Sequence, residues 1–198
     1  MNDNHIDPRA TEVLHFWFGR PDEPHHLQTR PEWFRKDPDF DALCARRFGA
    51  LIDAALRGEL AGWGTQPRTA LAEVIVLDQF TRNTRRGTAG MFAGDARALT
   101  VAKALVASGA DRTLPGVMRQ FVYLPFEHSE ALADQVESLR LFGQLGRDEP
   151  ALAGLLEWAQ KHYDIVARFG RFPHRNAALG RESTPEEVEF LKQPGSGF

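Results

Sequence analysis

Apolar residues recur at helical spacing along most of the chain, and no stretch shows the sustained apolar and polar alternation that marks a strand. The pattern predicts helices that begin near capping residues or prolines and end near glycines. The expected helices cover about residues 8–18, 38–58, 67–82, 95–108, 115–125, a segment carrying 132–142, 150–169 and a short segment opening at 184. The sequence therefore predicts an all-α protein.

Local signals add detail to this pattern. Asp7-Pro8 suits the entry of the first helix, and Thr184-Pro185-Glu186-Glu187 has the form of a capping box. Pro125 lacks the N–H group that a helix interior needs, so we expect the helix that starts at Pro115 to end or kink there. The 150–169 helix carries two apolar stripes, one of them containing Trp158, which predicts a central helix covered on two sides.

Seven or eight helices with mostly short connections fit a single domain over residues 1–198. Antiparallel neighbours of this kind stack either as a bundle or as a repeat-like superhelix, and the pattern alone leaves both open. No strict internal period marks a regular tetratricopeptide array.

Composition and charge are those of an ordinary globular protein, with 42% hydrophobic and 26% charged residues. The formal net charge is -3, so we expect neither nucleic acid nor an anionic membrane as a partner. Residues 1–8 lack the basic start and apolar run of a signal peptide, and no stretch is long enough to span a bilayer. These features predict a cytoplasmic protein.

Cys44 is the only cysteine, which excludes an internal disulfide and a cysteine-rich zinc site. It falls on a helical stripe with Phe40 and Phe48, so we expect it to be a buried and unreactive thiol.

Polar residues interrupt the apolar faces of three predicted helices, and burying them unpaired would cost about 1–3 kcal/mol each. Asp78 and Arg82 continue the apolar face of the 67–82 helix at a spacing that lets them pair. His128 precedes an apolar face, and His162 interrupts a stripe of the 150–169 helix. These side chains need polar partners inside the fold.

The segment 168–176 alternates basic, aromatic and hydrogen-bonding residues. We expect Phe169 and Phe172 to anchor it to the core and to hold its basic side chains in fixed positions. Together with the polar positions of the helices, this segment predicts one shared ligand-binding cleft. The candidate residues are Asp78, Gln79, Arg82, Asn83, Glu127, His128, Glu130, Arg171, His174, Arg175 and Asn176.

Three interpretations of this cleft stay open at this point. The residues can form a buried ion network that fixes the register of the helices. They can bind a small anion, a carboxylate-bearing metabolite or a peptide end through the clustered arginines. They can also catalyse a hydrolase or lyase reaction, with Glu127 or His128 as the acid–base group and Asp78 orienting it.

Other chemistry has less support in the sequence. Glu127 and Glu130 share a helix face from which His128 points away, so no metal site is predicted. No cofactor is predicted, because the chain lacks a glycine-rich phosphate loop, and Ser129 lacks the flanking glycines of a nucleophile elbow. The sequence predicts neither an oligomeric state nor individual catalytic residues.

Several strings resemble a bacterial family of unknown function, DUF924, over nearly the full length. They are Phe16-Trp17-Phe18-Gly19, Trp33-Phe34, Leu77-Asp78-Gln79-Phe80 with Arg82-Asn83, residues 123–130, residues 168–176 and residues 183–187. The resemblance implies a tetratricopeptide-like α/α superhelix and brings no established activity. Thr81 departs from the proline expected in this family, which implies a helix that extends further here. Analogy with tetratricopeptide proteins also suggests peptide binding on a concave face.

Overall fold

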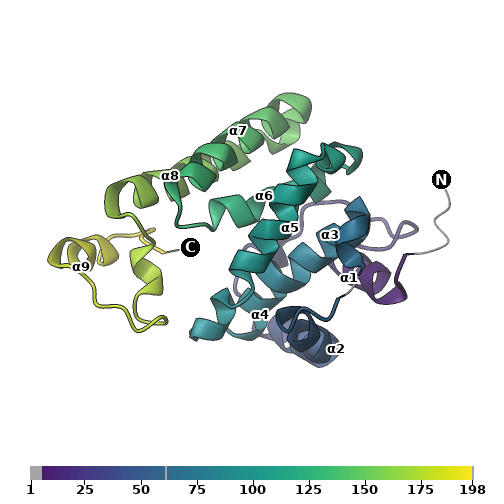
Figure 1. Ribbon diagram of the computed structural model, residues 1–198, viewed down its shortest axis with the longest axis horizontal. Coiled ribbons are helices and arrows are strands. Elements are labelled where there is room, and N and C mark those ends of the chain that lie inside the picture. The colour runs from purple at the N-terminus through teal and green to yellow at the C-terminus, as the bar shows by residue number, and fades with distance from the viewer. Residues whose placement is uncertain (1–5, 61, 198) are drawn as a thin grey trace.

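The computed structural model describes residues 6–60 and 62–197, and within these ranges the chain forms helices and turns without a strand. The α-helices are α1 (Pro8–Phe18), α2 (Pro38–Leu56), α3 (Pro67–Val74), α4 (Thr81–Thr84), α5 (Asp95–Ala107), α6 (Gly116–Glu127), α7 (Leu132–Asp148), α8 (Leu155–Phe169) and α9 (Pro185–Leu191). Figure 1 shows α7 and α8 side by side at the top of the molecule and α2 at the bottom. The prediction of an all-α fold is confirmed.

Helices that follow one another along the chain also contact one another in space. α5 packs on α6, α6 on α7, and α7 on α8, while α3 contacts α1, α5 and α6. This succession of neighbour contacts is consistent with an all-α superhelical fold. Among the described helices, none combines the length and the apolar character needed to cross a membrane.

Two predicted start signals lie where helices begin. The Asp7 carboxylate accepts a hydrogen bond from Arg9 N at 2.9 Å, and Pro8 is the first residue of α1. Thr184 and Glu187 form the predicted capping box of α9, with reciprocal bonds between backbone N–H and side-chain oxygen of 2.8 and 3.2 Å. Such bonds satisfy N–H groups that have no partner within the helix.

A continuous helical rod carries the centre of the fold. It consists of α3, the π-helical segment Ile75–Phe80 and α4. π-Helical turns inside α-helices are frequent at functional sites. The rod continues through Thr81, whose hydroxyl donates to the Leu77 carbonyl at 2.7 Å. The helix therefore does extend past Thr81, as expected.

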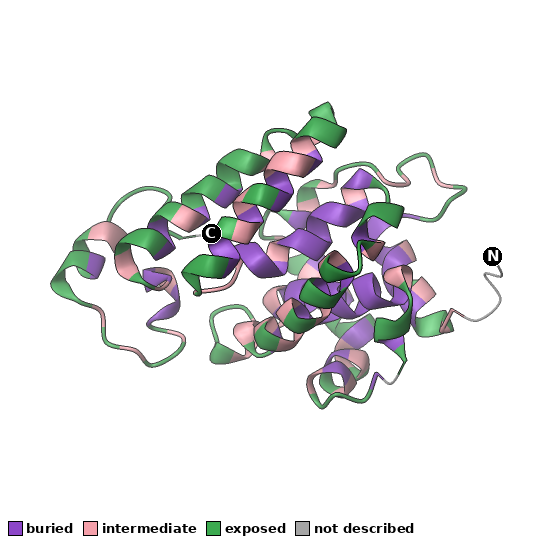
Figure 2. Ribbon diagram, turned by 45° about the horizontal axis from the view of Figure 1, so that its top comes forward, coloured by how far each residue is buried: buried purple, intermediate pink, exposed green. Residues whose placement is uncertain are grey.

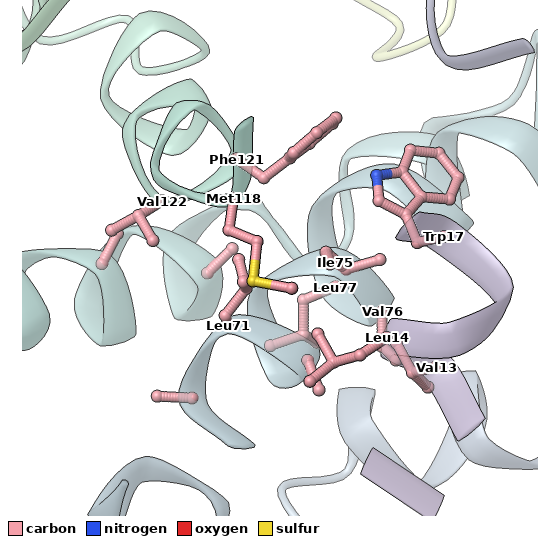
Figure 3. Packing of buried hydrophobic residues seen from close by; sticks show 14 of the residues in the cluster. Val13, Leu14, Trp17, Leu71, Ile75, Val76, Leu77, Met118, Phe121 and Val122 are labelled. Atoms are coloured by element: carbon pink, nitrogen blue, oxygen red, sulfur yellow. The ribbon is translucent and has the colours of Figure 1, made fainter. Parts of the chain in front are cut away.

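The hydrophobic core lies between α1, the rod and α6. Figure 3 shows buried side chains of α1, the rod and α6 gathered there, among them Trp17, Leu71 and Phe121. Trp17 is completely buried, and its ring meets that of Phe121 edge to face at 5.5 Å between centroids. Cys44 is buried as predicted, and burial raises the pKa of its thiol to about 12. Figure 2 shows the buried residues concentrated in the central helices.

The buried face of α7 differs from the one that the apolar pattern predicts. Leu132 and Val136 are 47% and 53% exposed, whereas Gln135 and Ser138 are fully buried. Phe142 and Leu145 are buried on the same face as Gln135. The side-chain amide of Gln135 donates to the Glu127 carbonyl at 2.7 Å. That carbonyl belongs to the end of α6, where carbonyl groups lack partners within the helix. The inward face of α7 therefore combines apolar packing with a polar contact to α6.

α8 is an outer helix, and the prediction of a central helix covered on two sides is wrong. Trp158 is 50% exposed and Leu156 is 38% exposed. α8 packs mainly on α7, and each of its stripes is covered only in part: Ala159 and Val166 of one stripe and Ile165 of the other are buried. α6 continues through Pro125 and ends two residues later at Glu127.

Candidate functional site

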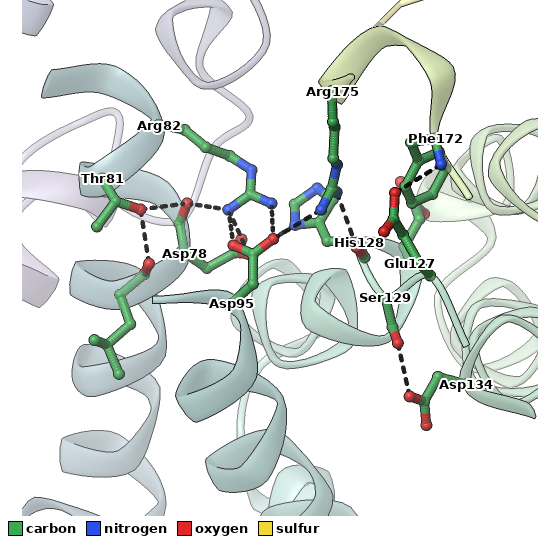
Figure 4. A network of polar contacts seen from close by, with 12 residues as sticks. Asp78, Thr81, Arg82, Asp95, Glu127, His128, Ser129, Asp134, Phe172 and Arg175 are labelled. Carbon is green, nitrogen blue, oxygen red and sulfur yellow. Dashed lines mark hydrogen bonds and ion pairs between the residues drawn. The ribbon is translucent and has the colours of Figure 1, made fainter. Parts of the chain in front are cut away.

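Polar side chains from several segments meet at the C-terminal end of α6. They come from the rod, the first turn of α5, the end of α6, α8 and the 3-10 turn Pro173–Arg175. Figure 4 shows how the side chains of Asp78, Arg82, Asp95 and Arg175 lie next to His128. Residues from distant parts of the sequence therefore form one polar cluster.

Asp78 lies fully buried in the π-helical segment and has three side-chain partners. His128 Nδ1 lies 2.7 Å from Asp78 Oδ1, Arg82 Nη1 lies 2.9 Å from the same oxygen, and Gln79 Nε2 donates to Oδ2 at 2.6 Å. Burial by itself raises the pKa of Asp78, but the charge of Arg82 and the contact with His128 outweigh it and hold the pKa below its usual range. Asp78 is therefore a carboxylate that orients His128.

Asp95, the first residue of α5, bridges two arginines that are far apart in the sequence. Its carboxylate accepts hydrogen bonds from Arg82 at 2.8 and 3.0 Å and from Arg175 at 3.0 Å. Gly94 permits this approach of α5 to the rod, because a Cβ atom at Gly94 would collide with the Leu77 carbonyl. The charges of both arginines are thus met by one carboxylate from a neighbouring helix.

Arg175 encloses the cluster from the C-terminal part of the chain. Its Nη2 donates to the His128 carbonyl at 2.8 Å. Its guanidinium carbon lies 4.6 Å from the ring centroid of Phe92 and 4.7 Å from that of Phe172. Aromatic faces at this distance attract a cation. Arg175 is therefore held by two rings, a carboxylate and a backbone carbonyl.

Glu127, the last residue of α6, faces His162 of α8. Glu127 Oε1 lies 3.1 Å from His162 Nδ1, which also lies 2.9 Å from the carbonyl of Trp158. Across residues 6–60 and 62–197, no lysine or arginine contacts the Glu127 carboxylate, which is almost completely buried. Burial, together with the negative charge of Asp78, raises the pKa of Glu127 to about 8. The fold gives this acid no cationic partner among the described residues, so the metal-free protein holds it mainly in the protonated form at neutral pH.

Burial lowers the pKa values of the histidines in this region. Burial lowers the pKa of His128, and the charge of Arg82 lowers it further. Burial also lowers the pKa of His162 to about 3 and that of His174 to about 4. A neutral imidazole donates from one nitrogen and offers the lone pair of the other, which suits it to bind a metal ion.

Part of the predicted site is brought together as expected. The residues in mutual contact are Asp78, Gln79, Arg82, Glu127, His128 and Arg175, with the Glu127–His128 pair joined through the chain. The ring of His174 lies beside this cluster, 5.5 Å from that of Phe172. Asn83 lies elsewhere, since it donates to Asp41 of α2 at 2.7 Å.

The other predicted residues fasten the C-terminal segment. Glu130 accepts hydrogen bonds from Arg181 at 2.7 and 2.9 Å. Arg171 donates to the Glu187 carboxylate at 2.6 and 2.8 Å, and Asn176 donates to the same carboxylate at 3.2 Å. Glu130, Arg171 and Asn176 therefore hold the chain around α9 in place.

Sequence reasoning misses two members of the cluster. Asp95 is the first residue of a helix, and acidic residues are common there because they interact favourably with the helix dipole. An aspartate at this position therefore does not indicate a functional site. The pattern singles out His162 as a polar interruption, but it does not relate α8 to the end of α6. The contact between His162 and Glu127 depends on how α8 packs, which the sequence alone does not specify.

Three of these side chains are placed to bind a cation. Glu127, His128 and His162 each offer one oxygen or nitrogen atom, and these atoms all lie within 4.8 Å of one another. The sequence analysis considers a metal site only among neighbouring residues such as Glu127 and Glu130. In the structure, the third side chain, His162, comes from another helix. Two imidazoles and a carboxylate suit Zn²⁺ and other divalent transition metals. The same groups can also exchange protons with a substrate.

Comparison with known proteins agrees with the fold. The chain is similar to the solved structure of a protein of unknown function from Agrobacterium tumefaciens, with 40% sequence identity and a TM-score of 0.81. The similarity covers 93% of this chain and 97% of that chain. No curated protein matches the sequence. The model of a family described as bacterial protein of unknown function (DUF924) matches residues 13–195, and this chain belongs to that family.

Proposed function

We propose that this protein binds a divalent transition-metal ion through Glu127, His128 and His162, in a centre of the type that metal-dependent hydrolases use. The observation that carries the proposal is the convergence of these three side chains from two helices, with one donor atom of each within 4.8 Å of the others. Three protein ligands leave a coordination position for water, which distinguishes catalytic zinc sites from closed structural ones.

The surroundings of the two histidines support metal binding. His128 Nδ1 contacts the Asp78 carboxylate at 2.7 Å, and His162 Nδ1 contacts the Trp158 carbonyl at 2.9 Å. Metal-ligating histidines almost always donate their other ring N–H to a carboxylate or a backbone carbonyl. Both imidazoles have such a partner, and that partner fixes their orientation.

The lack of a cationic partner for Glu127 supports the same proposal. A network built for stability alone pairs its buried charges, as Asp95 does with Arg82 and Arg175. Glu127 has no such partner among the described residues, and its contact is the uncharged His162. A bound divalent cation would supply the missing positive charge.

Two other interpretations receive less support. An anion- or peptide-binding cleft needs arginines directed at a ligand, but Arg171 and Arg175 direct their hydrogen bonds to Glu187 and Asp95. A purely structural ion network accounts for the arginines and leaves Glu127 unexplained. The remaining rival is a metal-independent hydrolase or lyase in which Glu127 or His128 acts as the acid–base group and Asp78 orients it.

Calorimetric titration of chelator-treated protein with Zn²⁺ and Co²⁺ tests the proposal. We expect one ion per chain in the wild type. Glu127→Gln, which removes an anionic ligand at constant size, should weaken binding at least about tenfold, and Asp78→Asn about 10–100-fold. Glu130→Gln is the matched control, because its carboxylate is occupied by Arg181, and it should bind like the wild type.

Turnover of p-nitrophenyl esters and phosphodiesters, with and without the metal, separates the proposal from its rival. Turnover that depends on added metal and is lost in Glu127→Gln supports a metal-dependent hydrolase. Turnover that persists in chelator and is lost in His128→Ala supports the acid–base enzyme. Absence of saturable metal binding, or equal binding by Glu127→Gln and Glu130→Gln, overturns the proposed metal centre.

A further inference from the structure

A cavity of about 420 Å³ lies between α1, residues 20–30 and α2. We call it the α1–α2 cavity, and Figure 1 shows these helices on the opposite side of the molecule from α8 and α9. We propose that the α1–α2 cavity binds a small organic carboxylate with a planar, apolar body. This inference is independent of the proposed metal centre.

The floor of the cavity suits a planar apolar group. Phe16 of α1 and Phe40 of α2 line it and stack with their ring centroids 5.1 Å apart, and Leu43 completes the apolar surface. The rings of Phe16 and Phe40 are largely buried. The apolar body of a ligand can contact Leu43 and the parts of these two rings that face the cavity.

Guanidinium groups surround this floor. Arg47 lies over the Phe16 ring at 5.0 Å, and Arg30 lies over the Phe40 ring at 5.7 Å. Arg30 also donates to the Phe16 carbonyl at 2.8 Å, at the end of α1. These contacts hold the two positive groups beside the rings before any ligand arrives, so ordering them adds little to the cost of binding.

The acidic side chains of the cavity wall already have partners within the protein. Glu12 pairs with Arg47 at 2.9 Å. Glu23 accepts a hydrogen bond from Arg20 N at 2.7 Å and lies 3.2 Å from His25. Within the described part of the chain, the guanidinium of Arg20 has no carboxylate partner. One positive charge at the rim therefore lacks an anion.

The titration of His15 agrees with a positive potential in the cavity. His15 lines the wall, and burial lowers its pKa, with further lowering by the charges of Arg20 and Arg68. An anion bound near Arg20 would compensate these charges. The carboxylate of the ligand is thus expected at the Arg20 and His15 side, with its apolar body on Phe16 and Phe40.

The wall formed by residues 20–30 depends on a tight turn at Gly19. Gly19 has φ +80°, and its carbonyl lies 3.0 Å from His26 Nδ1. A Cβ atom at Gly19 would lie 3.0 Å from the His25 ring, so the turn favours glycine on both counts. The segment therefore folds back over α1 and encloses a volume within the usual range of small-molecule sites, about 300–1,000 Å³.

Binding of 4-fluorobenzoate, followed by ¹⁹F NMR in the presence of a chelator, tests the inference. We expect saturable binding of one molecule per chain, and weaker binding of the neutral isostere 4-fluorobenzamide. Arg20→Ala should weaken binding of the benzoate about fivefold, the effect of one lost exposed ion pair. Arg46→Ala is the matched control, because Arg46 is an exposed neighbour of Arg47 that does not line the cavity.

Leu43→Trp supplies a second test, since an indole in place of Leu43 fills the floor and should abolish binding while leaving the charges unchanged. The inference is overturned if 4-fluorobenzoate shows no saturable binding. It is also overturned if the benzamide binds as tightly as the benzoate, or if Arg20→Ala and Arg46→Ala have equal effects. Because the chelator removes any bound metal, each of these outcomes is independent of the proposed metal centre.

Discussion

Replacing Asp95 by alanine removes the carboxylate that lies between Arg82 and Arg175, and with it three charge-assisted hydrogen bonds. Both arginine side chains are largely buried, with exposures of 15% and 8%. Breaking a buried ion pair costs about 3–5 kcal/mol when the remaining charge has no other partner. Here Arg82 keeps Asp78 at 2.9 Å, and Arg175 keeps the His128 carbonyl at 2.8 Å. We therefore expect the lower end, a loss of about 3 kcal/mol in the free energy of unfolding.

Urea unfolding followed by circular dichroism measures this loss as a lower midpoint at an unchanged m value. For a chain of this length, the melting temperature should fall by roughly 6–12 °C. Glu186→Ala is a suitable control, because it removes an exposed ion pair with Arg168 and should cost less than about 1 kcal/mol. If Asp95→Ala costs no more than this control, the reasoning that Asp95 joins α5 to the rod and to the C-terminal segment is refuted.

Two further predictions concern other parts of the fold. The hydrogen bond from Arg171 lowers the pKa of Glu187 to about 2, so the stabilisation from this carboxylate is fully present above its unfolded-state pKa and is lost as the pH falls. The difference in unfolding free energy between wild type and Glu187→Gln should therefore shrink between about pH 4.3 and pH 2, and a constant difference would contradict the assignment. Ser138→Ala removes a buried hydroxyl without a hydrogen-bond partner among the described residues. It should raise the free energy of unfolding by about 1 kcal/mol, and a loss in urea unfolding would show that the hydroxyl is satisfied.

The fold class could be predicted from the sequence because helical periodicity and end signals are local properties. Asp7, Gly19 and Thr184 act on the backbone within a few residues of their own positions, and they mark helix ends in the structure as expected. The facing of the later helices is not local. Leu132 and Val136 of α7 have the spacing of a core stripe, yet they are exposed, because α7 turns inward the face that carries Gln135, Phe142 and Leu145.

The candidate site could also be predicted from the sequence only where its contacts are local. The four-residue spacing of Asp78 and Arg82 predicts their pairing, and the need of Asp78 for partners agrees with its contact to His128. The sequence does not specify which acid each arginine of the 168–176 segment meets. Arg171 turns to Glu187 and Arg175 to Asp95, although the two arginines lie four residues apart. Such choices depend on tertiary packing, which composition and spacing do not contain.

The polar cluster divides into two parts that should respond differently to substitution. Asp78 and Asp95 together balance the charges of Arg82 and Arg175, so removing a member costs stability. Glu127 is buried without a cation, and burial raises its pKa to about 8, so at neutral pH the metal-free protein bears the cost of protonating this acid. Glu127→Gln should therefore leave the free energy of unfolding of metal-free protein unchanged or higher, while Zn²⁺ should stabilise the wild type far more than the variant.

Urea unfolding of both proteins, with and without Zn²⁺, provides the measurement. If Glu127→Gln instead unfolds as easily as Asp95→Ala in the absence of metal, then Glu127 belongs to the structural network. In that case the lack of a cationic partner does not distinguish Glu127 from the other buried acids. A gain in stability together with a loss of the response to Zn²⁺ would show that this position is kept as glutamate at the expense of the fold, which is the behaviour expected of a functional residue.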